Sequence, residues 1–295
     1  MKIIRKKKAL VTGAASGIGR AIALALAAEG ADLYLVDVDG ERLDLTASDA
    51  RRYGGVVVTD VRDLSDPKQV TAVAVAVLST WGQLNILVNN AGTAYYGPTH
   101  EMTKDQWDKI LSLNLLTPIQ LVRELLPTLS AQDEANIVNV CSVCGLVPMR
   151  KGAAYQTTKF GLVGFSAALR AEYGGRDFGI TALCPGFVDT AMIEKFETIG
   201  HQRRHRIPTW MCTSADKVAK RAIVAIRHNE GLVVVSPIAR LLWFAMRLSP
   251  GFLDWITREG WRQRRRVRVA PLASHQTQAE EKQIGNSADI LTRAA

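Results

Sequence analysis

The sequence has few cysteines and prolines, and no apolar run long enough to cross a membrane. Four cysteines in 295 residues are too few for a disulfide framework, which indicates a reducing compartment such as the cytoplasm. Ten prolines and an apolar share of 47% exclude a disordered or collagen-like chain. The most apolar region, 231–248, is interrupted by Pro237, Arg240 and Arg247, so it cannot supply the ~20 residues of a spanning helix.

Acidic residues are scarce in residues 1–8 and 231–270. Residues 1–8 carry a charge of +5 and residues 231–270 carry +6, whereas residues 9–230 and 271–295 each sum to −1. The N-terminal cluster is followed by only three apolar residues, so it is not a secretion signal. Basic ends can contact an anionic membrane or nucleic acid. No recognised nucleic-acid-binding module accompanies them, and no nucleic-acid partner is expected.

Seven short, β-rich apolar runs alternate with longer helical patterns. Continuous apolar runs are typical of parallel strands covered on both faces, and strand–helix alternation predicts right-handed βαβ units in an α/β fold. The strand candidates are Ala9–Thr12, Leu33–Asp37, Val56–Thr59, Leu84–Asn89, Asn136–Ser142, Ile180–Cys184 and Leu232–Val235.

The segment Val70–Val77 has the period of a strand, because Val and Ala alternate along it. Asp66 and Pro67 before it form an N-cap and a first helical position. A parallel sheet also needs a crossover at this point. We therefore predict a helix here.

The first strand candidate runs into a glycine-rich turn. Glycines permit a tight turn and close approach of a pyrophosphate, which then lies at a helix N-terminus. The pattern predicts a dinucleotide site, although the spacing G-x-x-x-G-x-G differs from G-x-G-x-x-G and a plain strand–helix turn is the alternative. The residues concerned are Gly13, Ser16, Gly17, Ile18 and Gly19.

Asp37 ends the second strand candidate, 18 residues after Gly19. An acidic side chain at that position can accept hydrogen bonds from both ribose hydroxyls of an adenosine. It would also repel a 2′-phosphate, and neither Ser16 nor Val38 supplies a cation to attract one. We therefore expect NAD rather than NADP as the cofactor.

At this point the chain resembles the classical short-chain dehydrogenase/reductase family, over about residues 7–235. Besides the glycine turn, the resemblance rests on Asp60-Val61, Asn89-Asn90-Ala91-Gly92, Asn114, Ser142, Tyr155-x-x-x-Lys159, Pro185-Gly186 and Thr190, in this order. It implies a single domain with a Rossmann-like, doubly wound parallel sheet of about seven strands. The residues beyond 235 predict a C-terminal helical extension to this domain.

The resemblance implies four catalytic residues. Tyr155 and Lys159 share one face of a helix because they are four residues apart. A free tyrosine has a pKa of ~10, which a lysine and the nicotinamide cation would lower. By resemblance, Tyr155 exchanges the proton with the substrate, Ser142 hydrogen-bonds the same oxygen, and Asn114 holds a water linked to Lys159.

The cofactor contacts implied by the family involve further residues. Lys159 would hold the nicotinamide ribose, next to Tyr155. Asp60 and Val61 would frame the adenine. The others would line the nucleotide or contact the carboxamide: Asn90, Gly92, Pro185, Gly186, Val188 and Thr190.

Two further motifs are set aside. Cys141-x-x-Cys144 follows a strand and does not open a helix, which disfavours a thioredoxin-like site. His201 and His205 have helical spacing but no evident third ligand, so no metal site is predicted.

We divide the chain into a catalytic domain (1–235), a basic amphipathic extension (236–270) and a disordered tail (271–295). Large apolar residues, three of the six tryptophans and clustered arginines suit 238–268 to an anionic membrane surface; packing on the body or on an oligomer partner is the alternative. The family commonly forms dimers or tetramers, so a homo-oligomer is expected. We expect a cytoplasmic protein, in peripheral contact with a membrane where 238–268 binds its surface.

The predicted function is hydride transfer between NAD(H) and a secondary alcohol or ketone. The apolar segment after Thr190 favours a lipophilic substrate. The alternative is an NAD-binding sensor or scaffold without significant turnover. A third reading, nucleic-acid binding through the basic ends, would show strong salt dependence.

Overall fold

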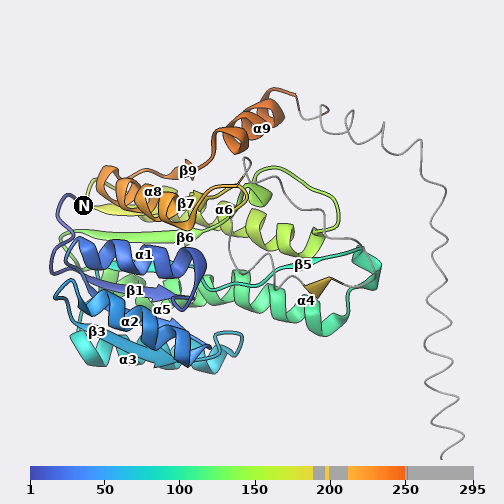
Figure 1. Cartoon of the computed structure of the whole chain (residues 1–295). Helices are drawn as coiled ribbons and strands as arrows, with labels where there is room; N and C mark the ends of the chain where they lie inside the picture. Colours follow the sequence, from blue (N-terminus) through green and yellow to red (C-terminus); the bar gives the residue numbers. More distant parts are fainter. Residues whose placement is uncertain (189–196, 199–211, 250, 252–295) are drawn as a thin grey trace, which may run out of the picture. The chain divides into compact units, whose positions relative to one another are not determined.

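A parallel sheet of seven strands forms the centre of the computed structural model, which describes residues 1–188, 197–198, 212–249 and 251 (Figure 1). The strand order is β3-β2-β1-β4-β6-β7-β9, and every neighbouring pair is parallel. The strands are β1 (Lys8–Thr12), β2 (Asp32–Asp37), β3 (Val57–Val61), β4 (Ile86–Asn89), β6 (Ala135–Val140), β7 (Phe178–Cys184) and β9 (Leu232–Val234).

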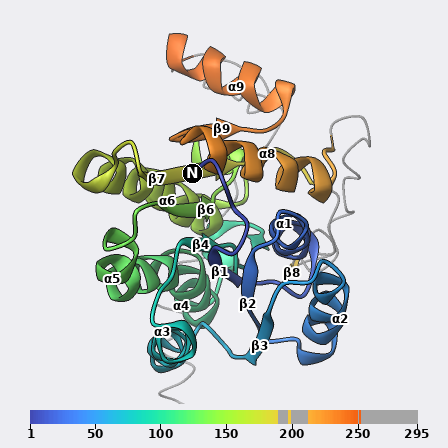
Figure 2. The same ribbon diagram turned by 90° about the vertical axis from the view of Figure 1, so that its left-hand side faces the viewer.

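Helices cover both faces of the sheet (Figure 2). One face carries α1 (Gly17–Ala28), α2 (Gly40–Arg51) and α8 (Ala215–His228), and the other carries α3 (Pro67–Trp81), α5 (Thr117–Ser130) and α6 (Ala153–Tyr173). The other described elements are β5 (Tyr95–Tyr96), η1 (Thr99–Glu101), α4 (Lys104–Leu111), the π-helical turn η2 (Ser112–Leu116), η3 (Val143–Gly145), β8 (Glu197–Thr198) and α9 (Pro237–Leu248).

The seven predicted strands are all present, which confirms the doubly wound α/β fold. Their continuous apolar pattern has the expected cause, because β6 is buried at all six positions between the two helical layers. The helix predicted across Val70–Val77 is α3. The Asp66 side chain caps it by accepting a hydrogen bond from the Lys68 amide (2.9 Å), and Pro67 is its first residue.

Residues 1–248, which include α9, form one compact unit. Most of the predicted extension and the whole predicted tail lie outside the described residues, so their proposed boundaries remain predictions. Among the described residues, no helix is both long and apolar enough to cross a membrane.

The buried Tyr34 on β2 makes the stability of the fold depend on pH in the alkaline range. It is buried against Trp81, and its hydroxyl donates a hydrogen bond to Asp60 (3.1 Å). Burial, with the negative charge of Asp60, raises the pKa of Tyr34 to about 12. The unfolded chain releases this proton near pH 10 while the native chain keeps it, so the free energy of unfolding falls as pH rises from 10 to 12.

We expect Tyr34→Phe to remove this contribution, which is at most about 1.4 kcal/mol per pH unit. Urea unfolding at pH 9, 10 and 11 measures it as the difference in slope between variant and wild type. Tyr53→Phe, at an exposed tyrosine, is the control and should keep the wild-type slope. An unchanged slope for Tyr34→Phe would show that Tyr34 titrates normally.

Candidate active site

The predicted site residues gather at the carboxyl edge of the sheet, where the strand order reverses between β1 and β4. Ligands of open α/β sheets bind at such a switch point. The glycine turn follows β1, Asn90 follows β4, Ser142 follows β6 and Pro185 follows β7. Because these four strands are neighbours in the sheet, their loops meet at one edge.

The turn after β1 has a geometry that favours glycine. Gly13 has φ +66° and Gly17 has φ +56°. At Gly19, an added Cβ would lie 2.0 Å from the Gly13 carbonyl oxygen and 2.3 Å from the Asn90 amide nitrogen. The Asn90 side chain holds this close approach by donating to the carbonyl oxygens of Thr12 (3.1 Å) and Gly13 (2.9 Å).

The N-terminus of α1 is suited to an anion. Its N-cap, Ser16, is exposed and makes no capping hydrogen bond with its side chain, and the first turn contains no acidic residue. The first backbone N–H groups of α1 therefore lack a side-chain acceptor, and a phosphate would satisfy them and the helix dipole.

We expect opposite effects from alanine at two helical glycines. Gly19→Ala should destabilise the fold by a few kcal/mol and abolish nucleotide binding, because the added methyl overlaps the Gly13 carbonyl. Gly164→Ala, in the exposed interior of α6 with no atom within 4 Å of the new Cβ, should stabilise the fold by about 0.5–1 kcal/mol.

Urea unfolding and the thermal shift on adding NAD measure both effects. Tolerance of Gly19→Ala, with nucleotide binding intact, would contradict the close packing of this turn.

Two backbone amides orient the carboxylate of Asp37. One oxygen accepts from the Ala15 N–H (2.9 Å) and the other from the Asp39 N–H (3.1 Å). Val38, the next residue, and Val61, the partner of Asp37 on β3, both have exposed side chains. In the part of the chain that the structure describes, no cation pairs with Asp37. The residues therefore fit an adenosine ribose better than a 2′-phosphate.

Two side chains that the sequence analysis did not identify hold the carboxylate of Asp60 in place. Its carboxylate accepts from Tyr34 and forms an ion pair with Arg62 (2.8 Å). Arg62 also donates to Gln69 (3.0 Å), and its backbone N–H donates to the carbonyl of Asp37. The predicted contact with adenine would use the remaining lone pairs of Asp60, whereas Val61 stays exposed at the end of β3.

Ser142, Tyr155 and Lys159 come together at the ends of β6 and α6. The Ser142 hydroxyl accepts from the Cys144 N–H (3.1 Å) and hydrogen-bonds the Tyr155 side chain. Lys159 places its ammonium 5.7 Å from the centre of the Tyr155 ring and donates to the Val140 carbonyl (2.8 Å). This places a phenol, a hydroxyl and a buried amine at one point.

Burial sets the protonation of this group. It raises the pKa of Tyr155, which the Ser142 hydrogen bond partly offsets, and it lowers the pKa of Lys159. Without a bound cofactor, the phenol therefore keeps its proton through neutral and mildly alkaline pH. It is ready to donate to a carbonyl oxygen, whereas proton abstraction would need an added positive charge nearby.

Asn114 lies in the π-helical turn η2 and is fully buried. Its amide accepts from the Thr93 N–H and donates to the Thr93 carbonyl (both 2.8 Å), and it also donates to the Thr158 hydroxyl (3.3 Å). Thr158 in turn donates to the carbonyl of Tyr155 (2.7 Å). The side chain of Asn114 thus ties the loop after β4 to α6, and the water that it is expected to hold remains a prediction.

The remaining predicted contacts lie along the same edge. An added Cβ on Gly92 would lie 3.1 Å from the Asn114 side-chain oxygen, and one on Gly186 would lie 2.7 Å from the Ser236 hydroxyl oxygen. The Pro185 carbonyl accepts from the Val143 N–H (2.8 Å), and Val188 bridges to Thr213. Thr190, with His201 and His205, lies outside the described residues.

Sequence reasoning missed the residues that hold this site together. Gln156 clamps Met149 through both of its backbone groups (2.6 and 2.7 Å). A buried series of side-chain hydrogen bonds also joins Asn89 to Asn139 (2.8 Å) and Asn139 to Ser166 of α6 (2.9 Å). The sequence feature that could have indicated these hydrogen bonds is the presence of asparagines within otherwise apolar strands.

In the part of the chain that the structure describes, none of the four cysteines forms a disulfide. Cys141 and Cys144 flank Ser142, and the Cys144 sulfur lies 3.6 Å from that of Met149. Burial raises the pKa of Cys144, which disfavours the thiolate that a redox site needs.

Comparison with known proteins places these features in a family. The short chain dehydrogenase family matches residues 7–199. The 3-oxoacyl-[acyl-carrier-protein] reductase of Thermotoga maritima is 33% identical over 233 residues, which cover 79% of this chain and 94% of that protein.

Two solved structures have the same fold. A short chain dehydrogenase/reductase from Burkholderia phymatum in complex with NAD has a TM-score of 0.76 and 27% identity, covering 92% of this chain and all of that one. A single-residue variant of actinorhodin polyketide ketoreductase with NADPH has a TM-score of 0.71 and 27% identity, covering 80% and 97%. The chain belongs to the short-chain dehydrogenase/reductase family of oxidoreductases.

Proposed function

We propose that this protein interconverts a secondary alcohol and a ketone with NAD(H), and that Tyr155 is the general acid and base. The observation that carries the proposal is the meeting of Tyr155, Ser142 and Lys159 at the same sheet edge as the glycine turn. A bound nicotinamide would supply or accept the hydride.

The protein's own residues would handle the proton. In the reducing direction, the Tyr155 hydroxyl donates its proton to the carbonyl oxygen, and the Ser142 hydroxyl hydrogen-bonds the same oxygen. Lys159 stabilises the resulting phenolate by its positive charge. Asn114 and Thr158 fix the helix that carries Tyr155 and Lys159.

The choice of NAD over NADP rests on Asp37. One of the two solved relatives is a complex with NAD and the other is a structure with NADPH, so membership of the family does not decide it. The oriented carboxylate of Asp37 supports NAD, because it accepts from ribose hydroxyls and repels a phosphate.

A lipophilic substrate, a cytoplasmic location, peripheral membrane contact through 238–268 and a homo-oligomer are further proposals. The substrate proposal rests on the apolar sequence after Thr190, which lies outside the described residues. The competing function, an NAD sensor or scaffold, would use the same cofactor residues without turnover.

One experiment separates these functions. Purified protein is tested for thermal stabilisation by NAD and by NADP, and then for NADH fluorescence with a panel of small polar, long-chain and polycyclic alcohols. We expect selective stabilisation by NAD and turnover of the lipophilic alcohols. Stabilisation without any turnover would favour the sensor, turnover of polar alcohols alone would reject the lipophilic substrate, and stabilisation by neither nucleotide would reject the cofactor site.

A further inference from the structure

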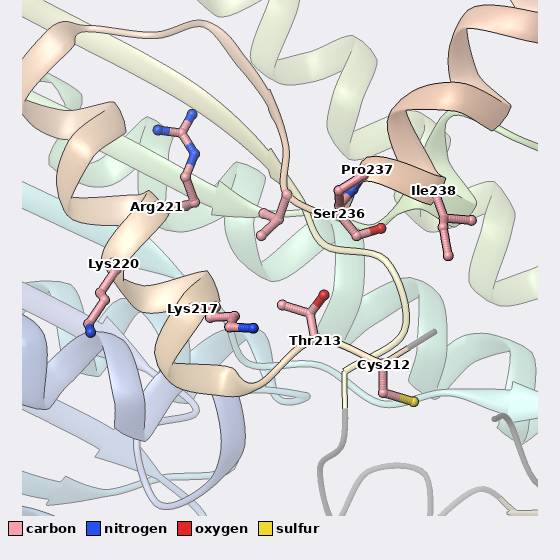
Figure 3. A pocket seen from close by; sticks show the side chains of 9 residues that line it. Cys212, Thr213, Lys217, Lys220, Arg221, Ser236, Pro237 and Ile238 are labelled. Atoms are coloured by element: carbon pink, nitrogen blue, oxygen red, sulfur yellow. The ribbon is translucent and has the colours of Figure 1, made fainter. Parts of the chain in front are cut away.

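A cavity of about 480 Å³ lies between α8 and the first turn of α9 (Figure 3). Its lining combines positive charge with an apolar wall and includes no acidic residue. The charged residues are Lys217, Lys220 and Arg221 of α8, and the apolar ones are Val235, Pro237 and Ile238. This composition fits an anion attached to an apolar group.

The cavity's positive charge is only partly neutralised. Arg221 pairs with Glu230 (2.7 Å), whereas Lys217 and Lys220 are exposed and make no ion pair with any residue that the structure describes. Figure 3 shows Lys217 directed toward Thr213. Lys220 is drawn turned away, and its exposed four-carbon side chain can rotate toward the opening. Such a rotation of Lys220 would bring a second ammonium group to the cavity beside that of Lys217.

The apolar wall continues along α9 as an exposed stripe. Pro237, Leu241, Phe244 and Leu248 are spaced i, i+4, i+7 and i+11, which places them on one face of the helix. The exposed fractions of Leu241, Phe244 and Leu248 are 70%, 58% and 72%. We define these four residues as the α9 stripe.

Positive charge accompanies the α9 stripe. Arg240 and Arg247 are both exposed, and α9 has no acidic residue. Arg247 lies 5.4 Å from the ring of Trp243, and Arg240 also donates to the Val234 carbonyl (2.8 Å), which ties α9 to β9. A tryptophan beside arginines and an apolar face is typical of helices at a membrane interface.

We propose that the α9 stripe enters an anionic phospholipid surface while the phosphate of a lipid headgroup binds Lys217 and Lys220. This inference deepens the proposed membrane contact and does not depend on turnover. A lipid is favoured over a free phosphate because the stripe begins at the cavity's own wall, Pro237. It is favoured over a second copy because a symmetric pairing of this face would bring like charges together.

The test is co-sedimentation of the full chain with vesicles at physiological salt. Vesicles of phosphatidylcholine alone are compared with vesicles that contain about one third phosphatidylglycerol. We expect binding to the anionic vesicles. The double variant Lys217→Gln/Lys220→Gln should weaken it about 25-fold, since each surface charge contributes about fivefold. The variant Leu241→Ser/Phe244→Ser should weaken it at least tenfold. Lys68→Gln/Lys109→Gln, which removes two exposed lysines elsewhere, should bind like wild type.

Further measurements on the same proteins distinguish a lipid from a soluble anion in the cavity and from a second copy of the protein on the α9 stripe. Equal vesicle binding by wild type and Lys217→Gln/Lys220→Gln would overturn the headgroup site. Thermal stabilisation by inorganic phosphate with no vesicle binding would show a site for a soluble anion and overturn the lipid proposal. Light scattering that detects a dimer lost in Leu241→Ser/Phe244→Ser, again without vesicle binding, would assign the stripe to a second copy. Nucleotide binding and turnover should be unchanged in these variants, so a failure of the proposed chemistry would be visible separately.

Discussion

Tyr155→Phe is expected to lower turnover between a hundredfold and ten-thousandfold while NAD binding is retained. The substitution removes only the hydroxyl that Ser142 contacts and leaves the ring beside Lys159. The loss corresponds to general acid–base catalysis by one positioned group. NADH fluorescence under saturating substrate measures turnover, and the thermal shift on adding NAD measures binding.

Tyr173→Phe is the matched control for this result. Tyr173 is the last residue of the same helix, α6, and is exposed. It should keep full turnover. Wild-type turnover by Tyr155→Phe would instead show that another group transfers the proton, and an unaltered biological role despite lost turnover would favour the sensor function.

Asp37→Asn is expected to shift the ratio of kcat/KM for NADP over NAD upward by about 100-fold. The change keeps the size of the side chain and removes the charge that would repel a 2′-phosphate. Like charges in contact cost several kcal/mol, and a hundredfold ratio corresponds to about 2.7 kcal/mol. Steady-state kinetics with each nucleotide, at a fixed concentration of one alcohol, give the ratio.

The control for this prediction is Asp39→Asn. Asp39 caps α2 by accepting from the Arg42 N–H (3.1 Å), and asparagine is an equally good N-cap, so the fold and the cofactor ratio should be unchanged. Asp37→Asn leaves either the Ala15 or the Asp39 N–H without an acceptor, so a lower melting temperature is expected with it. A wild-type preference for NADP would contradict the assignment of Asp37 directly.

The strands and the cofactor turn were predictable because local rules determine them. Buried parallel strands need continuous apolar residues, as in β6, and the close approach at Gly19 excludes any side chain. Asp66 and Pro67 identified α3 against its strand-like period, since capping is also a local interaction.

The interactions that hold Ser142, Tyr155 and Lys159 in place were not predictable in the same way. The π-helical turn at Asn114 and the clamp of Gln156 on Met149 join segments that only the tertiary fold brings together. Likewise, the cavity at Lys217 forms only where α8 meets the segment from Val235 to Ile238, and no spacing in the sequence encodes that meeting.

The buried series of hydrogen bonds from Asn89 through Asn139 to Ser166 also bears on how the protein folds to a single structure. Apolar packing between α6 and the sheet tolerates small shifts along the helix axis, because one aliphatic contact can replace another. A hydrogen-bonded match has no such substitute, since a shift would leave buried amides unpaired. We therefore expect these hydrogen bonds from Asn89 of β4 through Asn139 to Ser166 to favour one register of α6, the helix that carries Tyr155.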